Sequence, residues 1–304
     1  AKCCASTAEI LAVQSLVNDI LVTKGTKEQK EKYLPMVAEG RIGAFALTEA
    51  GAGSDASAAR TKAVSDGDNY IINGSKCFIS NMGPEEGDYV ILIALTDPSA
   101  GVKGMSAIIV DRGTPGFSIG KVEDKMGIRG AAVSELVFED CVVPKTNLIG
   151  KEGEGFKIAM SALDGGRIGI AAQALGIAEA AIDASVEYSK QRSQFGKPIS
   201  ALQGIQWYLA DMATRTEAAK LLILQAADMR SRGENVTKEA AMAKYFASEN
   251  AVYVTDRAVQ IHGGYGYMKD YPIERMYRDA RITPLYEGTS EVQKMVISRA
   301  VIGK

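Results

Sequence analysis

The stretch "NYIINGSKCFISN", residues 69–81, decides the fold class that this sequence predicts. Its β-branched and aromatic residues form two short runs on either side of the turn pair Asn73-Gly74, a pattern typical of paired β-strands. Similar runs, separated by further turn pairs, follow at residues 88–97, 104–120 and 131–144. Short strands at this spacing predict a compact all-β barrel or sandwich over residues 41–150.

The segments on both sides of this β-region have helical patterns. Residues 7–25 and 26–40 predict two helices, which cannot bury their own apolar faces and need a partner layer. From Glu152 onward, long Ala-rich segments predict an antiparallel helical bundle, with the single tryptophan, Trp207, in its core. Helix-start signals in this part stand at Ser200, Thr237 and Pro272. The predicted domains are a partial helical domain at 1–40, a β-barrel domain at 41–150 and a helical bundle domain at 151–304.

The composition is globular and argues against several classes of protein. Of the 304 residues, 46% are hydrophobic and 24% are charged, and the formal net charge is -2. A nucleic-acid-binding chain would show a basic excess, so we expect no nucleic-acid partner. No uninterrupted apolar run approaches the roughly 18 residues that span a bilayer, so we expect no membrane span. The N-terminus also lacks the pattern of a signal peptide.

Cysteine and histidine usage limits the possible chemistry. The four cysteines, Cys3, Cys4, Cys77 and Cys141, form no CxxC pair, so we expect no metal site and a reducing compartment. His262 is the only histidine. Histidine-based catalysis therefore has one candidate.

Three stretches combine glycine, aromatic and charged residues in ways that leave two interpretations open. "TEAGAGSD" (48–55) and "HGGYGY" (262–267) are either tight turns or backbone that meets a phosphate or a flat ring. "RSQFGKPI" (192–199) is either an ordinary link between helices or a site where Arg192 and Phe195 meet a phosphate beside a ring. None of them fits a dinucleotide fingerprint or a P-loop.

A fourth stretch, "LYEGTSEVQ" (285–293), places Glu287 between an aromatic residue and a glycine, just before a helical pattern. Three roles are open for this carboxylate. It is a turn residue, a helix-start acid favoured by the helix dipole, or a catalytic base.

Taken together, these motifs resemble the acyl-CoA dehydrogenase family, and most closely its short-chain, butyryl-type members. The resemblance covers essentially the whole chain. It is carried, in this order, by "TEAGAGSD", "NGSKCFISN", "GIRG…FEDCVVP", "LDGGRIGIAAQALG", "RSQFGKPI", "QIHGGYGY" and "RDARITPLYEGTSEVQ".

The resemblance implies an α+β multidomain fold with a helical N-terminal segment, a central β-barrel and a C-terminal four-helix bundle. FAD is expected at the junction of the barrel and the bundle. The chain is expected to begin inside the family's N-terminal helical domain, without that domain's first helices, so that part of the substrate cavity is missing.

The resemblance also assigns the cofactor residues. Thr48 is expected at the pyrimidine edge of the flavin, Phe78 against its ring and Ser80 toward N5, where many relatives carry Trp and Thr in place of Phe78 and Ser80. Arg192 is expected to meet the pyrophosphate of a neighbouring subunit's FAD. Many relatives have Gln where Glu291 stands. The full expected set is Phe45, Leu47, Thr48, Phe78, Ser80, Arg192, Phe195, Gln260, Gly263, Gly264, Thr289 and Glu291.

Glu287 matches the family's catalytic glutamate. Some branches place the base one residue before the arginine that matches Arg167, where this chain has Gly166, which carries no base. His262 falls in the cofactor turn and is expected to be structural. The expected substrate contacts are Ser54, Leu163, Asp164, Arg167, Tyr286 and Gly288.

The implied activity is FAD-dependent oxidation of a short-chain acyl-CoA to the trans-2-enoyl-CoA. Glu287 takes the α-proton and a hydride passes from Cβ to flavin N5. The implied partner is an electron-transferring flavoprotein, the implied assembly a homodimer or homotetramer, and the compartment a bacterial cytoplasm or the mitochondrial matrix. The alternatives are an enoyl-CoA reductase of an anaerobe acting on crotonyl-, acryloyl- or aryl-acrylyl-CoA, and a non-catalytic member of the superfamily.

Overall fold

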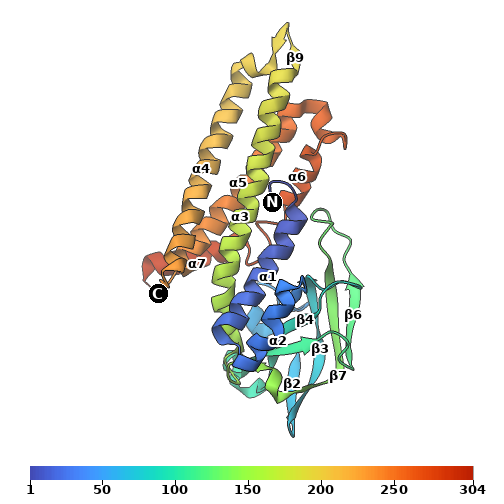
Figure 1. The fold of residues 1–304 in the computed structure, drawn as a ribbon. Coiled ribbons are helices and arrows are strands. Elements are labelled where there is room, and N and C mark those ends of the chain that lie inside the picture. Colours follow the sequence, from blue (N-terminus) through green and yellow to red (C-terminus); the bar gives the residue numbers. More distant parts are fainter. Residues whose placement is uncertain (304) are drawn as a thin grey trace. The chain divides into compact units, whose positions relative to one another are not determined.

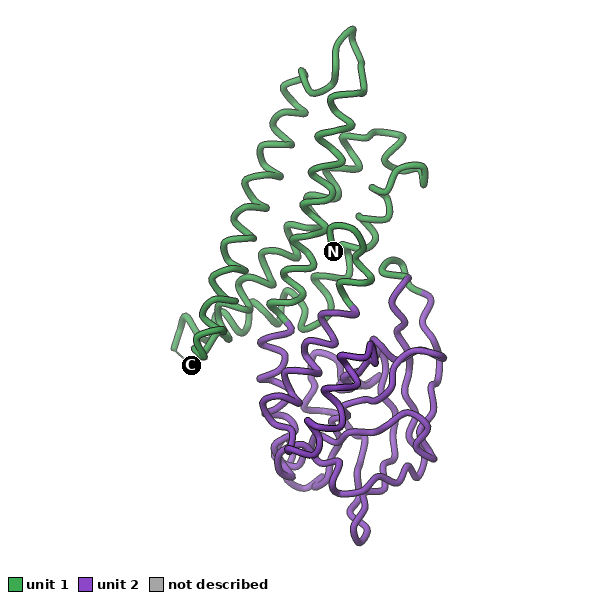
Figure 2. The backbone as a smooth tube through the Cα atoms, in the orientation of Figure 1, with its two compact units in different colours: residues 1–9, 125–129, 167–304 green, residues 10–124, 130–166 purple. Residues whose placement is uncertain are grey.

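The computed structural model describes residues 1–303, and Lys304, the last residue of the predicted C-terminal domain, lies outside them. The chain forms two compact units, shown in different colours in Figure 2. The sheet unit consists of residues 10–124 and 130–166, and the helical unit consists of residues 1–9, 125–129 and 167–304.

The sheet unit is built around one eight-stranded sheet (Figure 1). The strand order is β6-β7-β3-β2-β4-β5-β8, and β1 pairs in parallel with β4. The strands are β1 (Gly43–Ala46), β2 (Lys62–Asp66), β3 (Asn69–Ser80), β4 (Tyr89–Leu95), β5 (Met105–Asp111), β6 (Phe117–Val122), β7 (Val133–Pro144) and β8 (Leu148–Ile149).

Strand β4 shows why a nearly continuous apolar run forms the centre of this sheet. Tyr89, Ile91 and Ile93 face one core, which also contains apolar residues of helix α1 (Ala5–Lys24), helix α2 (Lys27–Ala38) and the start of helix α3 (Gly155–Gln191). Val90 and Leu92 face a second core made by the other strands. Because side chains alternate along a strand, both faces of β4 are buried. The sheet and α3 are thus the partner layer that the N-terminal helices need.

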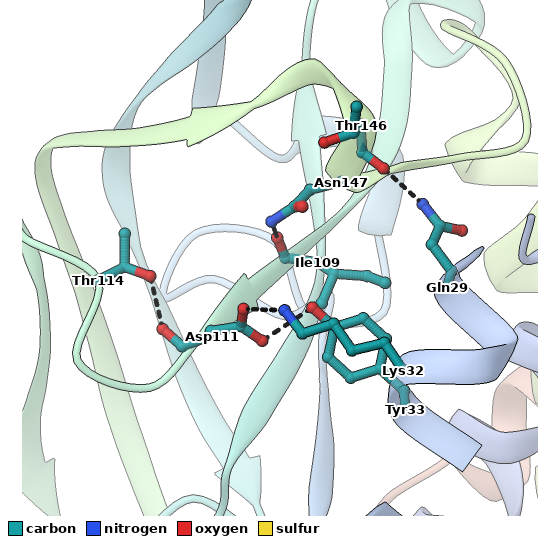
Figure 3. Close-up of polar contacts among 8 residues, drawn as sticks. All are labelled: Gln29, Lys32, Tyr33, Ile109, Asp111, Thr114, Thr146 and Asn147. Carbon is teal, nitrogen blue, oxygen red and sulfur yellow. Dashed lines mark hydrogen bonds and ion pairs between the residues drawn. The ribbon is translucent and has the colours of Figure 1, made fainter. Parts of the chain in front are cut away.

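Polar contacts attach α2 to the sheet (Figure 3). Tyr33 Oη and Lys32 Nζ donate to the two carboxylate oxygens of Asp111 at the end of β5, at 2.8 and 2.7 Å. Gln29 Nε2 donates to the carbonyls of Thr146 and Leu148 at 2.9 Å each. Gln29 also completes a capping box with Thr26, which confirms the predicted start of this helix.

The helical unit contains the rest of α3 and the later helices (Figure 1). A core of Ala178, Ala181, Met212, Val254 and Ala258 joins α3, α4 and α5. A two-stranded hairpin connects α3 to α4. These elements are β9 (Ser193–Gln194), β10 (Lys197–Pro198), α4 (Gln203–Ser231), α5 (Thr237–His262), α6 (Ile273–Ala280) and α7 (Ser290–Ile302).

The predicted fold class, with a helical N-terminal segment, a central β-region and a C-terminal helical bundle, is confirmed. Thr237 begins α5 and Pro272 directly precedes α6, as predicted. Ser200 does not begin α4, because it lies in a short 3-10 turn and the helix starts at Gln203. The domain boundaries at 40 and 150 stay a prediction.

The prediction that Trp207 lies in the bundle core is wrong. Its side chain is 62% exposed in this chain. Leu221 and Leu224 on the same helix are also exposed, and the buried residues of α4 are instead Met212, Thr216, Ala219, Ile223 and Ala226. The helical spacing of apolar residues in the sequence does not show which face of a long helix packs against its neighbours.

Helices α1 and α3 are long and apolar enough to span a membrane by length and composition alone, each with a mean hydropathy of 1.2 over 18 residues. The sequence prediction considered only uninterrupted apolar runs, so it did not identify these two helices by their mean hydropathy. Of these windows, 39% and 50% are buried within the protein, and core helices pass the same test. The lack of a membrane span stays a prediction.

Candidate active site

The segment before α7 makes a sharp turn at the candidate base. Glu287 has a φ of 54° and Gly288 a φ of 89°, so two consecutive residues occupy the left-handed region. Two buried side chains hold the turn from outside. Lys244 Nζ of α5 donates to the Gly288 carbonyl at 2.7 Å, and Gln293 Nε2 of α7 donates to the same carbonyl at 2.8 Å and to the Glu287 carbonyl at 3.2 Å.

The Glu287 carboxyl group lies in an environment that disfavours its charge. Its Oε2 atom is buried and has no hydrogen-bond partner among residues 1–303. Burial raises the pKa of Glu287 to about 7, against the charges of Arg167 and Lys244, which lower it, and with Glu9, which raises it further. A carboxyl group with a pKa near neutrality is suited to general base catalysis.

The alternative role of a helix-start acid belongs to another residue. Thr289 is the N-cap of α7, and its side chain accepts a hydrogen bond from the Val292 amide. Glu291 lies in the first turn of this helix, where backbone and Thr289 hydrogen bonds lower its pKa. The pKa of Glu287 is shifted in the opposite direction. Glu291 therefore has the environment of a helix-start acid, and Glu287 does not.

Tyr286 contributes a wall beside the turn. It is half-buried, and its hydroxyl donates to Gln173 Oε1 of α3. Gln173 in turn donates from Nε2 to the Ala5 carbonyl at 2.9 Å. Burial raises the pKa of Tyr286 well above its usual value, so the phenol stays neutral.

The predicted cofactor residues of the sheet unit lie on two neighbouring segments, namely Phe45, Leu47 and Thr48 on and after β1, and Phe78 and Ser80 on β3. The Cys77 amide donates to the Thr48 carbonyl at 3.0 Å. The fully buried Lys76 donates to the Leu47 carbonyl at 2.9 Å and to Glu49 Oε1 at 2.7 Å. The structure thus brings these two segments together.

Phe78 stands out within this set. The β3–β7 register shifts between Lys76 and Ile79, and Phe78 has a φ of 58°. Its side chain is 66% exposed. A positive φ at an aromatic residue is strained. Here it coincides with a ring that is open to contact by a flat group.

A second predicted set surrounds a cavity in the helical unit. The cavity has a volume of about 640 Å³, and its walls include Tyr188, Arg192, Phe195, His262, Gly263 and Gly264. Phe195 and Gly196 form the tip of the β9–β10 hairpin with φ values of 54° and 79°, and Phe195 is 89% exposed. A Cβ atom at Gly263 or Gly264 would meet nothing within 4 Å. The exposed Gln260 precedes these glycines in the last turn of α5.

His262 lies in this cavity wall as a packed residue. Its ring stacks on Tyr188 with 4.2 Å between centroids, and its Nδ1 lies 2.8 Å from the Ala258 carbonyl. Burial lowers the pKa of His262, so the ring is neutral. These contacts are those of a structural histidine, as expected.

The remaining predicted substrate residues are more dispersed. Ser54 is exposed in the sheet unit, whereas Leu163 and Asp164 are half-buried on α3. Arg167 is buried and belongs to the helical unit, where its charge acts on Glu287. Among residues 1–303, no group of three or more His, Cys, Asp or Glu side chains could hold a metal ion.

The sequence interpretation did not identify two buried lysines: Lys76, which contacts the segment after β1, and Lys244, which contacts the turn that carries Glu287. Lys76 and Lys244 are each 0% exposed. A signal for Lys244 was present, because it occurs in "AAMAKYFAS" among small residues that helical spacing places on the buried face of α5. Gln293 gave no comparable signal.

Comparison with known proteins identifies the fold family. The three family models describing the N-terminal, middle and C-terminal domains of acyl-CoA dehydrogenase match residues 1–41, 44–141 and 153–302. The chain is 60% identical to acryloyl-CoA reductase (NADH) of Anaerotignum propionicum, covering 99% of this chain and 77% of that protein. It is 54% identical to the short-chain specific acyl-CoA dehydrogenase of Clostridium acetobutylicum, covering 98% of this chain and 78% of that protein.

The structure of butyryl-CoA dehydrogenase from Megasphaera elsdenii superimposes with a TM-score of 0.97 at 52% identity, covering 99% of this chain and 79% of that one. The residues at the two predicted cofactor sets fit FAD, because exposed aromatic rings suit a flat ring system and the open glycines with Arg192 suit a phosphate. This chain belongs to the acyl-CoA dehydrogenase family and is an FAD-dependent oxidoreductase.

Proposed function

We propose that this protein oxidises a short-chain acyl-CoA to the trans-2-enoyl-CoA, with Glu287 as the base that takes the α-proton. One observation carries the proposal. The Glu287 carboxyl group is held in a strained turn, with Oε2 buried and without a hydrogen-bond partner among residues 1–303 and with a pKa raised to about 7.

The chemistry requires a base that stays deprotonated until the substrate arrives. The α-proton next to a thioester is weakly acidic, so its removal benefits from a base whose pKa lies close to the working pH. FAD, when bound, accepts the hydride from Cβ. Glu287 takes the proton from Cα, and Tyr286 and Gly288 are its neighbours in the chain. Regenerating the oxidised cofactor would require an external electron acceptor.

The residues that would hold FAD come from both predicted sets. We assign the flavin ring to Phe45, Leu47, Thr48, Phe78 and Ser80, and a neighbouring subunit's phosphates to Arg192, Phe195, Gln260, Gly263 and Gly264, with Thr289 and Glu291 near the adenosine. The exposure of Phe78 and Phe195 and the open space at the glycines support this assignment. For acyl-CoA, the proposed contacts are Ser54, Leu163, Asp164, Arg167, Tyr286 and Gly288.

The reverse reaction is the second candidate, and the comparisons favour it as strongly. Similar proteins include the 3-(aryl)acrylate reductase of Clostridium sporogenes at 53% identity and the caffeyl-CoA reductase–Etf complex subunit of Acetobacterium woodii at 51%. Both directions use the same groups, since a base that removes the α-proton also returns it. The redox partner sets the direction.

We propose an electron-transferring flavoprotein as that partner, because relatives carry this association in their names. We also propose a homodimer or homotetramer, in which one subunit's hairpin reaches the FAD of the next. A bacterial cytoplasm or a mitochondrial matrix suits this partner, and relatives come from bacteria and from mitochondria.

The activity is tested anaerobically on the yellow holoprotein with a panel of acyl-CoA thioesters. Butyryl-CoA is expected to bleach the flavin band and to yield crotonyl-CoA, faster than octanoyl-CoA or longer thioesters. Reduced flavin is then mixed with crotonyl-, acryloyl- and cinnamoyl-CoA, and the rates in the two directions are compared. A flavin that no thioester bleaches and no enoyl-CoA reoxidises would exclude both candidate reactions.

A further inference from the structure

We propose that Lys244 is a positioning residue of this site: its ammonium group holds the turn that carries Glu287 and keeps a positive charge beside the carboxylate that accepts the proton. The inference rests on the proposed role of Glu287. It concerns a residue on a different helix, α5, whose side chain does not need to touch substrate or flavin.

The backbone of the turn needs support from outside. A glutamate with a φ of 54° is in a conformation that costs on the order of 1 kcal/mol or more, and such residues persist where their surroundings determine them. The supports are the hydrogen bonds from Lys244 and Gln293 to the carbonyls of Glu287 and Gly288. Both supporting side chains are 0% exposed, so their position is fixed by packing.

The two supports differ in charge, which allows them to be separated. Gln293 is neutral and donates to both carbonyls of the turn. Lys244 donates to the Gly288 carbonyl at 2.7 Å and also lowers the pKa of Glu287 by its charge. Burying an ammonium group has a high desolvation cost. A contact that served only to hold the backbone could be made by a neutral donor without that cost.

The charged groups around the pair come from four helices. Glu287 is faced by Arg167 on α3, Lys244 on α5 and Glu9 on α1. The Lys244 ammonium is itself influenced by Glu287, Arg167, Glu249 and Glu291. Burial lowers the pKa of Lys244 to about 8 while Glu287 raises it, so each of the two groups favours the charged form of the other.

The charge therefore has a defined effect on the reaction. Below about pH 8, Lys244 is protonated and helps Glu287 to stay ionised. Without this charge, Glu287 holds its proton to a higher pH. The rise of the reaction rate with pH, which follows ionisation of the base, then moves to higher pH.

The test compares pH profiles of flavin bleaching by butyryl-CoA in the holoenzyme. In Lys244→Met and in Lys244→Gln, which keeps a neutral donor, the midpoint of the profile is expected to rise by at least about one pH unit. In Gln293→Leu the plateau is expected to fall by several-fold to about tenfold, with the midpoint unchanged. Lys238→Met, at a partly exposed lysine of the same helix, is the matched control and should behave as wild type.

A second measurement needs no turnover and no substitution of Lys244. Coupling between two titrating groups is reciprocal, so removing Glu287 must act on Lys244. In protein labelled with ¹³C at the lysine Cε, the Lys244 resonance, recognised by its midpoint near 8, is expected to titrate at a lower pH in Glu287→Gln than in wild type. This measurement decides the case if the Lys244 variants do not fold.

The outcomes separate the two proposals. Equal midpoints in wild type and both Lys244 variants, or a Gln293→Leu midpoint that moves as far as theirs, would overturn the role of Lys244. So would an unchanged Lys244 titration in Glu287→Gln. A Glu287→Gln variant that bleaches at wild-type speed would instead refute the proposed base.

Discussion

At the scale of single residues, the most informative group is the Glu287 carboxyl, because its surroundings oppose the charge that a surface glutamate carries. The nine-residue stretch around it leaves three roles open, and the structure separates two of them. Glu291 lies in the first turn of α7 with a lowered pKa, and Glu287 lies before the N-cap with a raised one.

This difference predicts a dependence of stability on pH. The pKa of Glu287 in the folded protein, about 7, lies above the usual value of about 4.3 for an unfolded chain. The folded state therefore favours the protonated carboxyl, and the stability that this group provides below about pH 4 is lost as the pH rises through 7.

Glu287→Gln imitates the protonated form at every pH. We expect its Tm to exceed that of the wild-type holoenzyme by several degrees at pH 8, and by much less at pH 5. The Tm difference at pH 8 corresponds to a difference in the free energy of unfolding on the order of 2–4 kcal/mol. A Tm difference that is the same at both values would mean that the carboxyl is not buried as described.

At the scale of elements, the turn between α6 and α7 depends on a glycine. Gly288 has a φ of 89°, and a Cβ atom there would lie 2.6 Å from Gln293 Nε2. We expect Gly288→Ala to lower both the Tm and the rate of flavin bleaching, since strain of about 1 kcal/mol is added and the Gln293 contact is displaced.

Gly40 provides a matched control, because it has the same φ of 89° and a Cβ atom there would meet nothing within 4 Å. Gly40→Ala should lower the Tm without changing the bleaching rate. If the two variants have equal rates, the Gln293 contact does not position Glu287.

The β9–β10 hairpin is the second element with a testable role. Arg192 at its base lies 5.8 Å from the ring centroid of Tyr265 and lines the cavity of the helical unit. Charge-assisted hydrogen bonds contribute about 1.5–3 kcal/mol. We therefore expect Arg192→Ala to release FAD roughly tenfold to a hundredfold more readily, with an unchanged circular dichroism spectrum.

Lys197→Ala, in the same hairpin but outside the cavity wall, is the control for that experiment. It should retain FAD as the wild type does. Equal FAD affinity in the wild type and in Arg192→Ala would return the hairpin to the simpler role of a link between helices.

The sequence could predict elements better than it could predict the support of the site. A capping residue acts locally, so Thr26 is predicted correctly, and the order of motifs identifies the family. The predicted turn at Asn73-Gly74 is wrong, because these residues lie inside the continuous strand β3, where the pairing with β7 shifts register between Ile72 and Gly74. The contacts of Lys244 and Lys76 join residues 44 and 29 positions apart in the chain, and no local pattern encodes them. Trp207 was misplaced for the same reason, since helical spacing does not show which stripe of a helix is covered.

At the scale of the whole molecule, the proposed assembly makes a prediction about the retention of FAD. If a neighbouring subunit supplies Arg192 and Phe195 to the FAD site, FAD should be retained only in a dimer or larger assembly. Sedimentation with detection at the flavin band measures both properties at once. A monomer with a full complement of FAD would contradict the shared site.

The exposed face of α4 offers an independent readout of assembly. Trp207 is the only tryptophan, so fluorescence quenching by acrylamide reports on this position alone. We expect quenching to be weak in the FAD-containing assembly and strong after dilution to subunits. Strong quenching in both would mean that α4 stays uncovered and that subunits meet elsewhere.

The most direct test of the central claim, that Glu287 is the base, is the rate at which butyryl-CoA bleaches the flavin in Glu287→Gln under anaerobic conditions. Glu31→Gln, the same substitution at an exposed position of α2, serves as the control. General bases contribute about 10²–10⁴-fold to a rate, so Glu287→Gln should bind FAD and acyl-CoA normally and bleach at least about a hundredfold more slowly, while the control matches wild type. Bleaching of Glu287→Gln at near wild-type speed would contradict the account.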